Sequence, residues 1–248
     1  MLQYQAPAEL LKDKVILVTG ASDGIGKSIA QSYAEYGATV ILHGRNVEKL
    51  EQVYDDIVNK GGAKPAILPL DLQNAAQQQY ISLAETVQSE LGRLDGILHN
   101  AAMISELSPI EYTEANLWHE MMQVNINSVF MLTQACLPLL RKAPAASIIT
   151  TTSGVGRKGR AFWGPYAVSK FAVEGFTQVL ADELETTNIR VNSINPGATR
   201  TKMRATAYPA EDASRLPSPA ELANLYLYLM GNESQTVHGQ SIDAQSKK

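Results

Sequence analysis

Cysteine and histidine are scarce in this chain of 248 residues. Cys136 is the only cysteine, so no internal disulfide can form, and its apolar neighbours predict an inert buried thiol. The four histidines are far apart and lie near no Cys or carboxylate cluster with metal-ligand spacing: His43, His99, His119 and His238. We therefore expect no metal site.

Long hydrophobic runs and an excess of basic residues are also lacking. No segment approaches the roughly 18 uncharged apolar residues of a membrane span, and residues 1–11 contain no basic segment followed by an apolar run. The formal net charge of −4 argues against a general nucleic-acid binder. We expect a cytoplasmic protein that binds neither membranes nor nucleic acid.

The hydrophobic pattern predicts an α/β fold. Short aliphatic and β-branched runs, expected as strands, alternate with longer amphipathic segments, expected as helices. The strands are expected at 15–18, 39–42, 66–68, 96–98, 147–149 and 191–194, and the helices at 26–36, 47–60, 73–91, 118–140, 165–185 and 219–230. This alternation is typical of a doubly wound (Rossmann) parallel sheet, here of about seven strands, with helices on both faces. The length suits a single domain spanning 1–248.

One segment, 198–217, breaks this regularity. Loops of such length inside compact domains are usually lids or binding segments. We interpret the segment as a substrate-binding flap, and a plain surface loop is the alternative.

A glycine-rich turn follows the first expected strand and precedes a helix. Gly20, Gly24 and Gly26 stand in the pattern GxxxGxG. Glycines let the backbone turn sharply and approach a pyrophosphate, whose charge then lies against the free N–H groups of a helix N-terminus. The pattern and its position indicate a dinucleotide site, the alternative being a tight turn without a ligand.

A tyrosine and a lysine stand four residues apart after a proline suited to the first turn of a helix. Tyr166 and Lys170 therefore project from one helix face. Lowering a phenol pKa by about three units requires roughly 4 kcal/mol, and one cation about 5 Å away at an effective dielectric near 20 supplies roughly 3 kcal/mol. Lys170 and the positive ring of an oxidised nicotinamide could make Tyr166 a proton-transfer group at neutral pH.

Two further polar residues are expected near this pair. Ser153 stands at the end of a buried strand, where open α/β sheets place their ligands, so its hydroxyl can bind a substrate oxygen. Asn125 lies in a segment that would border the same crevice, and a buried amide needs partners there. A purely structural asparagine is the alternative.

Together these motifs resemble the short-chain dehydrogenase/reductase family over nearly the whole chain. The glycine motif, His99-Asn100-Ala101-Ala102, Asn125, Ser153, the Tyr166/Lys170 pair and Asn195-Pro196-Gly197 follow one another at suitable spacings. The segments 124–127, 155–160 and 194–201 are most similar to the bacterial YciK-type oxidoreductases.

The resemblance implies a hydride transfer between a nicotinamide cofactor and a small carbonyl or alcohol substrate. In it Tyr166 exchanges the proton, Lys170 binds the ribose and lowers the Tyr166 pKa, Ser153 orients the carbonyl, and Asn125 holds a water in a proton relay. The implied cofactor contacts are Gly20, Ser22, Gly24, Ile25 and Gly26 at the phosphates, Asp71 and Leu72 at the adenine, Asn100 and Ala101 along the ribose, and Pro196, Gly197, Thr199 and Thr201 at the nicotinamide.

Two segments depart from the family pattern. His99 and Ala102 replace the usual flanking Asn and Gly, which affects hydrogen bonding in the central sheet more than the chemistry. Asp243-Ala244-Gln245 stands where the family often has Asp-Gly-Gly, which weakens any inference about subunit contacts.

The end of the second expected strand favours NADP(H) over NAD(H). NAD-selective folds have an acidic residue there that binds the ribose 2′-OH, whereas this chain has Gly44, followed by Arg45 and Asn46. Arg45 can approach a 2′-phosphate with a guanidinium group suited to it, and we expect Asn46 beside it to contact the cofactor too. Asp23, at a position often basic in NADP-using relatives, would weaken phosphate binding.

The substrate is predicted only as a class. An apolar pocket is expected from Met103, Ile104, Phe162, Trp163 and Met203, and three cations could attract an anionic group or belong to a solvated loop: Arg157, Lys158 and Arg160. A non-catalytic dinucleotide sensor, and an epimerase or dehydratase on the same fold, are the alternative functions.

A homo-oligomer, either a dimer or a tetramer, is also expected. Relatives are commonly tetrameric, and one helix carries more apolar residues than one buried face requires: Leu222, Leu225, Tyr226, Leu229 and Met230. The alternative is that some of these residues belong to the core.

Overall fold

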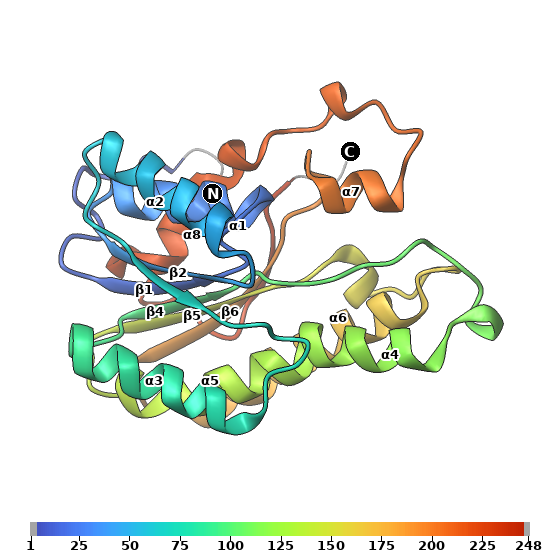
Figure 1. Cartoon of the computed structure of the whole chain (residues 1–248). Helices are drawn as coiled ribbons and strands as arrows, with labels where there is room; N and C mark the ends of the chain where they lie inside the picture. The colour runs from blue at the N-terminus through green and yellow to red at the C-terminus, as the bar shows by residue number, and fades with distance from the viewer. Residues whose placement is uncertain (1–3, 246–248) are drawn as a thin grey trace.

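Seven short strands form one parallel sheet in the computed structural model, which describes residues 4–245 (Figure 1). They are β1 Val15–Thr19, β2 Thr39–Gly44, β3 Ala66–Pro69, β4 Gly96–His99, β5 Ala146–Thr151, β6 Ile189–Asn195 and β7 Ser241–Asp243. The order across the sheet is β3-β2-β1-β4-β5-β6-β7. All six expected strands and the doubly wound fold are confirmed, and β7 is the strand that the hydrophobic pattern did not locate.

The order reverses between β1 and β4, and this reversal positions the site. Thr19 pairs with His43 of β2, and Val18 pairs with Leu98 of β4. The carboxyl ends of the three strands are therefore level, and the loops that leave them diverge. In open α/β sheets such a switch point opens a crevice for ligands.

Helices cover both faces of the sheet (Figure 1). One face carries α1 Gly24–Glu35, α2 Val47–Asn59 and α8 Ala223–Met230, and the other carries α3 Gln77–Leu91, α5 Ser128–Leu140 and α6 Gly164–Leu184. Two shorter helices, α4 Ala115–Met122 and α7 Lys202–Ala207, lie beyond the carboxyl end of the sheet. Single 3₁₀ turns occur at Ile110–Tyr112, Gly154–Gly156, Ala213–Arg215, Pro219–Leu222 and Asn232–Ser234.

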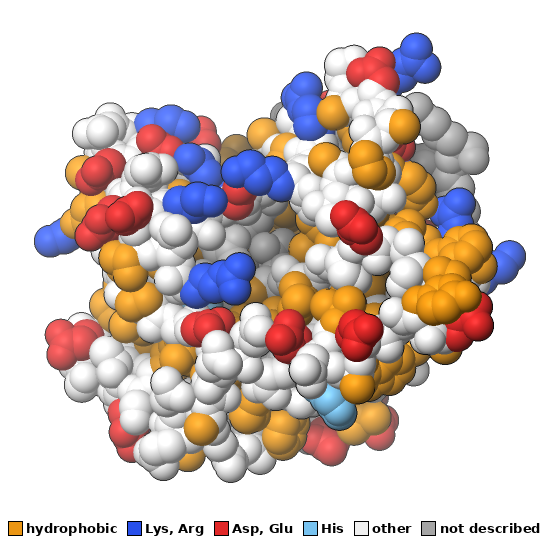
Figure 2. Space-filling model, turned by 45° about the vertical axis from the view of Figure 1, so that its right-hand side comes forward, with side chains coloured by type: hydrophobic (Ala, Val, Ile, Leu, Met, Phe, Trp, Pro, Cys, Tyr) orange, Lys and Arg blue, Asp and Glu red, His pale blue; other side chains and the backbone are white. Residues whose placement is uncertain are grey.

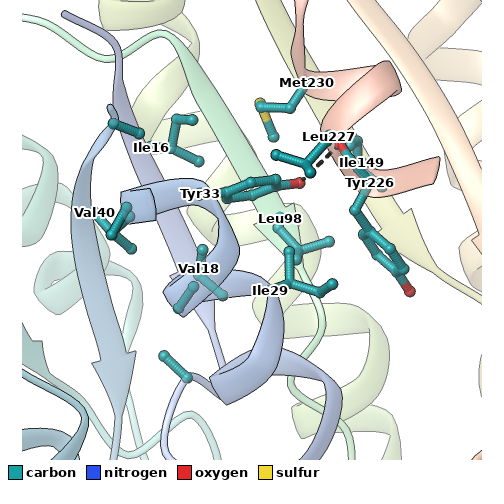
Figure 3. Packing of buried hydrophobic residues seen from close by; sticks show 14 of the residues in the cluster. Ile16, Val18, Ile29, Tyr33, Val40, Leu98, Ile149, Tyr226, Leu227 and Met230 are labelled. Carbon is teal, nitrogen blue, oxygen red and sulfur yellow. Dashed lines mark hydrogen bonds between the residues drawn. The ribbon is translucent and has the colours of Figure 1, made fainter. Parts of the chain in front are cut away.

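The core between α1, α8 and the sheet is densely apolar (Figure 3). The Tyr33 hydroxyl donates a hydrogen bond of 3.3 Å to the carbonyl of Tyr226 and so ties α1 to α8. The five apolar residues expected to leave a surplus face on the last helix are all buried here: Leu222, Leu225, Tyr226, Leu229 and Met230. They belong to the core, so their use as evidence for an oligomer interface was wrong.

Several expected helices differ from those observed. The segment expected as one helix over 118–140 is α4, a π-helical turn at Gln123–Asn127, and α5. The helix expected from residue 73 begins at Gln77, because Asp71 caps a turn by accepting hydrogen bonds from Gln73 N and Asn74 Nδ2. Segment 198–217 contains α7 and a 3₁₀ turn rather than only irregular chain.

Two smaller observations complete the fold. Cys136 is fully buried, as expected, and burial raises the pKa of its thiol to about 12. Within residues 4–245, no helix has both the length and the hydrophobicity needed to cross a membrane.

Candidate active site

The glycine turn after β1 is packed against the end of β4. Gly20 and Gly24 have φ of +67° and +55°, a conformation that favours glycine. A β-carbon on Gly26 would lie 2.2 Å from the Gly20 carbonyl oxygen, so only glycine fits there. Asn100 supports the turn from β4, because its Nδ2 donates a hydrogen bond of 3.2 Å to the carbonyl of Thr19. The turn is therefore shaped for close approach of a ligand to its backbone.

A cavity of about 410 Å³, called here the cofactor cavity, opens at this turn and the neighbouring strand ends. Figure 2 shows a hollowed face of the molecule with basic side chains at its edge. Most of the expected cofactor residues line this cavity: Gly20, Ser22, Gly24, Ile25, Arg45, Asp71, Leu72, Asn100, Ala101, Tyr166, Lys170, Pro196 and Thr201. Gly26 is buried behind the turn, and Asn46 instead caps α2, its Oδ1 accepting a hydrogen bond of 2.9 Å from Lys49 N.

The end of β2 forms the corner of this cavity where a 2′-phosphate would lie. Gly44 and the exposed Arg45 line it, and the Ser22 hydroxyl is close to Gly44. Asp23 is near the same turn, but Lys202 Nζ lies 2.8 Å from its Oδ2. This bond to Lys202 is the main cause that lowers the Asp23 pKa. The negative charge expected to weaken phosphate binding is therefore balanced by Lys202.

The expected tyrosine and lysine come together on the first turns of α6. Both are buried, and Lys170 Nζ lies 5.6 Å from the centre of the Tyr166 ring. The same ammonium donates a hydrogen bond of 2.8 Å to the carbonyl of Thr151, at the end of β5. This bond holds the Lys170 ammonium at the carboxyl end of β5.

Burial dominates the titration of both groups. It raises the pKa of Tyr166 to about 12, against a smaller lowering by a hydrogen bond with Ser153, and it lowers the pKa of Lys170 to about 8. The charged form of each group is disfavoured because the low-dielectric surroundings solvate it poorly. In the protein by itself the tyrosine is therefore protonated at neutral pH.

Asn125 lies within the π-helical turn between α4 and α5 and is almost fully buried. Its Oδ1 accepts a hydrogen bond of 2.8 Å from Met103 N, and its Nδ2 donates to the carbonyl of Met103 and to Ser169 Oγ, each at 3.0 Å. The side chain joins the segment after β4 to α6, one residue before Lys170. It lines neither cavity, so its contacts here are those of a structural residue that aligns α6.

A second cavity, of about 630 Å³ and called here the substrate cavity, adjoins the first. Three further expected residues line it, Ser153, Gly197 and Thr199, and three that line the first cavity line this one too: Tyr166, Pro196 and Thr201. Ile104, Trp163 and Met203 supply the expected apolar wall, while Met103 lines the cofactor cavity. Phe162 is 57% exposed and lines neither cavity, so the expectation for it was wrong.

Four residues at the site belong to no motif that the sequence shows. Thr151 accepts the Lys170 bond, Ser169 accepts the Asn125 bond, and Lys202 pairs with Asp23. Thr152 lines both cavities, and its buried hydroxyl has no hydrogen-bond partner within residues 4–245. The only sequence signal for Thr152 is its position directly before Ser153. A backbone turn that excludes a β-carbon, at the edge of a cavity lined by neighbouring strand ends, fits a bound dinucleotide.

Arg157 differs from its expected role. Its guanidinium contacts Glu174 Oε1 at 3.0 Å and Asp243 Oδ1 at 2.7 Å. Glu174 is buried and also accepts hydrogen bonds from the hydroxyls of Ser193 and Ser241. Arg157 therefore ties the turn after Ser153 to α6 and β7, and its charge is used inside the protein rather than toward a substrate.

Comparison with known proteins agrees with this geometry. A family model for short chain dehydrogenases matches residues 14–212. The uncharacterized oxidoreductase YciK of Escherichia coli (strain K12) is 51% identical over 244 residues, which cover 98% of this chain and 96% of that protein.

Two similar solved structures contain a cofactor. A short chain dehydrogenase from Shigella flexneri 2a (strain 301), complexed with NADP, is 51% identical with a TM-score of 0.95, and the match covers 97% of this chain and 100% of that one. A short chain dehydrogenase from Escherichia coli CFT073, complexed with NADPH, is 51% identical with a TM-score of 0.94 and the same coverage.

Proposed function

This chain belongs to the short-chain dehydrogenase family, an oxidoreductase family, and on that premise we propose that it transfers a hydride between NADP(H) and a carbonyl or alcohol substrate. One observation carries the proposal. Tyr166 lines both cavities, with Lys170 on its cofactor side and Ser153 on its substrate side. A proton donor at the junction of a dinucleotide site and a second cavity is what carbonyl reduction requires.

The residues that would hold NADPH follow from the lining of the cofactor cavity. The glycine turn would hold the pyrophosphate, Asp71 and Leu72 the adenosine, and the loop after β6 the nicotinamide end. When bound, NADPH supplies the hydride.

The side chains of this protein would manage the proton. In reduction, Ser153 holds the carbonyl oxygen and Tyr166 donates its proton to that oxygen. A pKa of about 12 keeps Tyr166 protonated at neutral pH, which suits this direction. In oxidation Tyr166 must accept the proton, and the nearby Lys170 ammonium favours the phenolate. Asn125 aligns α6 through its bonds to Met103 and Ser169. The proton-relay role that the resemblance implies for it stays a prediction.

Replacing the Tyr166 hydroxyl tests the proposal directly. Tyr166→Phe should lower NADPH-dependent turnover of a carbonyl panel by at least about a hundredfold, the low end for loss of a general acid. NADPH affinity, measured by calorimetric titration, should change little because Lys170 remains. The matched control is Tyr112→Phe, a 70% exposed tyrosine outside both cavities. Equal turnover by Tyr166→Phe and wild type in a chemistry-limited assay would remove Tyr166 from the mechanism.

We also propose that the protein prefers NADP(H) over NAD(H). Arg45 lines the corner at the end of β2, no carboxylate stands at Gly44, and the charge of Asp23 is balanced by Lys202. A charge-assisted hydrogen bond from Arg45 to the 2′-phosphate is worth roughly 1.5 to 3 kcal/mol, or about 10- to 150-fold in affinity. Titration of both cofactors into wild type and Arg45→Ala should show the preference reduced by about that factor. Equal wild-type affinities would refute it.

We propose that segment 198–217 acts as the substrate flap. Thr199, Thr201, Met203, Ala207 and Tyr208 from this segment line the substrate cavity. Its ion pair from Lys202 to Asp23 connects the flap to the glycine turn across the cofactor cavity. Cofactor binding and flap position are therefore expected to influence each other.

A further inference from the structure

The charged side chains that line the substrate cavity are all basic. Lys158, Arg160 and Arg204 line it, and no aspartate or glutamate is among its described lining residues. Arg204 is neutralised, because its guanidinium pairs with the carboxylate of Glu211 through contacts of 2.6 and 2.7 Å. Within residues 4–245, neither Lys158 nor Arg160 has a carboxylate oxygen within 4.0 Å. Two exposed positive charges therefore stand at the cavity without an internal counter-charge.

Arg160 is held in place at the cavity wall. Its Nη1 donates a hydrogen bond of 2.8 Å to the Tyr208 hydroxyl. The Tyr208 ring is itself held, since the Arg204 guanidinium carbon lies over it at 3.8 Å from the ring centre. A guanidinium group held by a neutral partner keeps donors for a ligand, whereas one paired with a carboxylate does not.

A row of aromatic rings separates this cation from the reacting centre. The ring centres of Tyr166 and Trp163 are 5.7 Å apart, and those of Trp163 and Tyr208 are 5.9 Å apart. A substrate whose carbonyl lies at Tyr166 would therefore run past an apolar wall about two rings wide before it reaches Arg160. Such a wall favours an apolar spacer.

From these contacts we infer that the substrate is a carbonyl compound with an apolar spacer and an anionic end, a carboxylate or a phosphate, that Arg160 and Lys158 bind. The inference rests on the proposed function, because it places the reacting carbonyl at Ser153 and Tyr166. It makes Arg160 a specificity-determining residue: the anion adds binding energy far from the bond that reacts and raises kcat/KM.

The test uses straight-chain methyl-ketone carboxylates with short, medium and long methylene spacers, each compared with its own methyl ester, and a matched phosphate monoester. NADPH oxidation gives kcat/KM for each. A medium or long acid should exceed its ester by at least about fivefold, the equivalent of about 1 kcal/mol for a partly exposed ion pair. High salt should reduce the ratio. The phosphate arm identifies which anion is preferred.

Variants separate the cation from general effects. Arg160→Gln should reduce the acid-to-ester ratio toward one, and Lys158→Gln should reduce it less. Arg141→Gln, which removes an exposed cation at the end of α5 and outside both cavities, should leave the ratio unchanged.

Failure of this inference can be told apart from failure of the proposed function. If esters are reduced as well as acids at every spacer length, the anion site is refuted and the oxidoreductase stands. If no ketone is reduced, the proposed function fails. A binding measurement then still tests whether the anion site exists. Quenching of Trp163 fluorescence in a Trp118→Phe background should then occur at lower concentration for the acid than for its ester. Equal concentrations would overturn the inference.

Discussion

Gly26→Ala is expected to destabilise the protein, although helix propensity alone predicts the opposite. Gly26 is the third residue of α1, and alanine is more favourable than glycine in a helix interior by about 0.8 to 1.0 kcal/mol. The surroundings reverse this sign. A β-carbon would lie 2.2 Å from the Gly20 oxygen and 2.6 Å from Asn100 Nδ2.

The cost follows from how far the turn must move. Ordinary van der Waals contact for a β-carbon begins near 3.4 Å, so the Gly20 carbonyl must move away by roughly 1 Å. In a well-packed site such a displacement costs about 1 to 3 kcal/mol of stability. The same movement strains the bond from Asn100 Nδ2 to Thr19 O, worth about 1 kcal/mol. Against the helix gain, a net loss of about 1 to 3 kcal/mol is expected. NADPH affinity should also fall, because Gly20 and Asn100 line the cofactor cavity.

Urea unfolding gives the stability, and calorimetric titration with NADPH gives the affinity. Gly159→Ala is the matched control, since a β-carbon there meets no atom within 4 Å and the backbone is not in the left-handed region. Its stability should equal wild type or exceed it by about 0.4 to 1 kcal/mol, through the unfolded chain. A Gly26→Ala protein with wild-type stability and NADPH affinity would refute the packing argument.

The remaining predictions concern acid stability and assembly. Burial lowers the pKa of His43 to about 4 and that of His99 to about 3. Below pH 6.5 the unfolded chain therefore binds protons that the folded protein does not. The free energy of unfolding falls as a result. At pH 5 each histidine contributes a loss of about 2 kcal/mol. His99→Asn should therefore make the fall between pH 6.5 and 5 shallower by about that amount, whereas an unchanged slope in urea titrations would contradict the assignment. A homo-oligomer remains predicted, and its interface is now expected at exposed apolar residues of α5 and α6: Phe130, Val168, Phe171 and Val179. Light scattering should give a mass that is a multiple of 26.9 kDa. Phe171→Glu should lower that mass. A monomer at all concentrations would exclude it.

Much of the site was predictable because local motifs carry it. The GxxxGxG pattern locates the turn between β1 and α1, since a ligand-approaching backbone needs glycine at fixed offsets. Tyr166 and Lys170 share a helix face whatever the rest of the chain does. Ser153 follows β5, whose apolar run marks a buried strand. In each case a few neighbouring residues contain the information.

The remainder depends on contacts between distant residues. The apolar pattern of 118–140 continues through the π-helical turn, so nothing in it shows that the helix register changes at Asn125. Arg157 looks like a solvated cation until α6 and β7 bring Glu174 and Asp243 beside it. β7 has three residues, two of them polar and exposed, and it forms only because β6 offers a free edge.

Lys170 shows how the demands of the site and of the fold differ. Its folded pKa of about 8 lies below the ordinary 10.5, so the folded protein binds this proton more weakly than the unfolded chain does. Below pH 8 that difference opposes folding by about 3 kcal/mol, and the penalty shrinks as the pH rises toward 10.5. A methionine would avoid the cost, because no carboxylate pairs with the ammonium among residues 4–245 and its hydrogen-bond acceptor is the Thr151 carbonyl. An ammonium that the fold alone disfavours, held 5.6 Å from the Tyr166 ring, agrees with the ligand binding and proton transfer proposed for this site, which stability does not require.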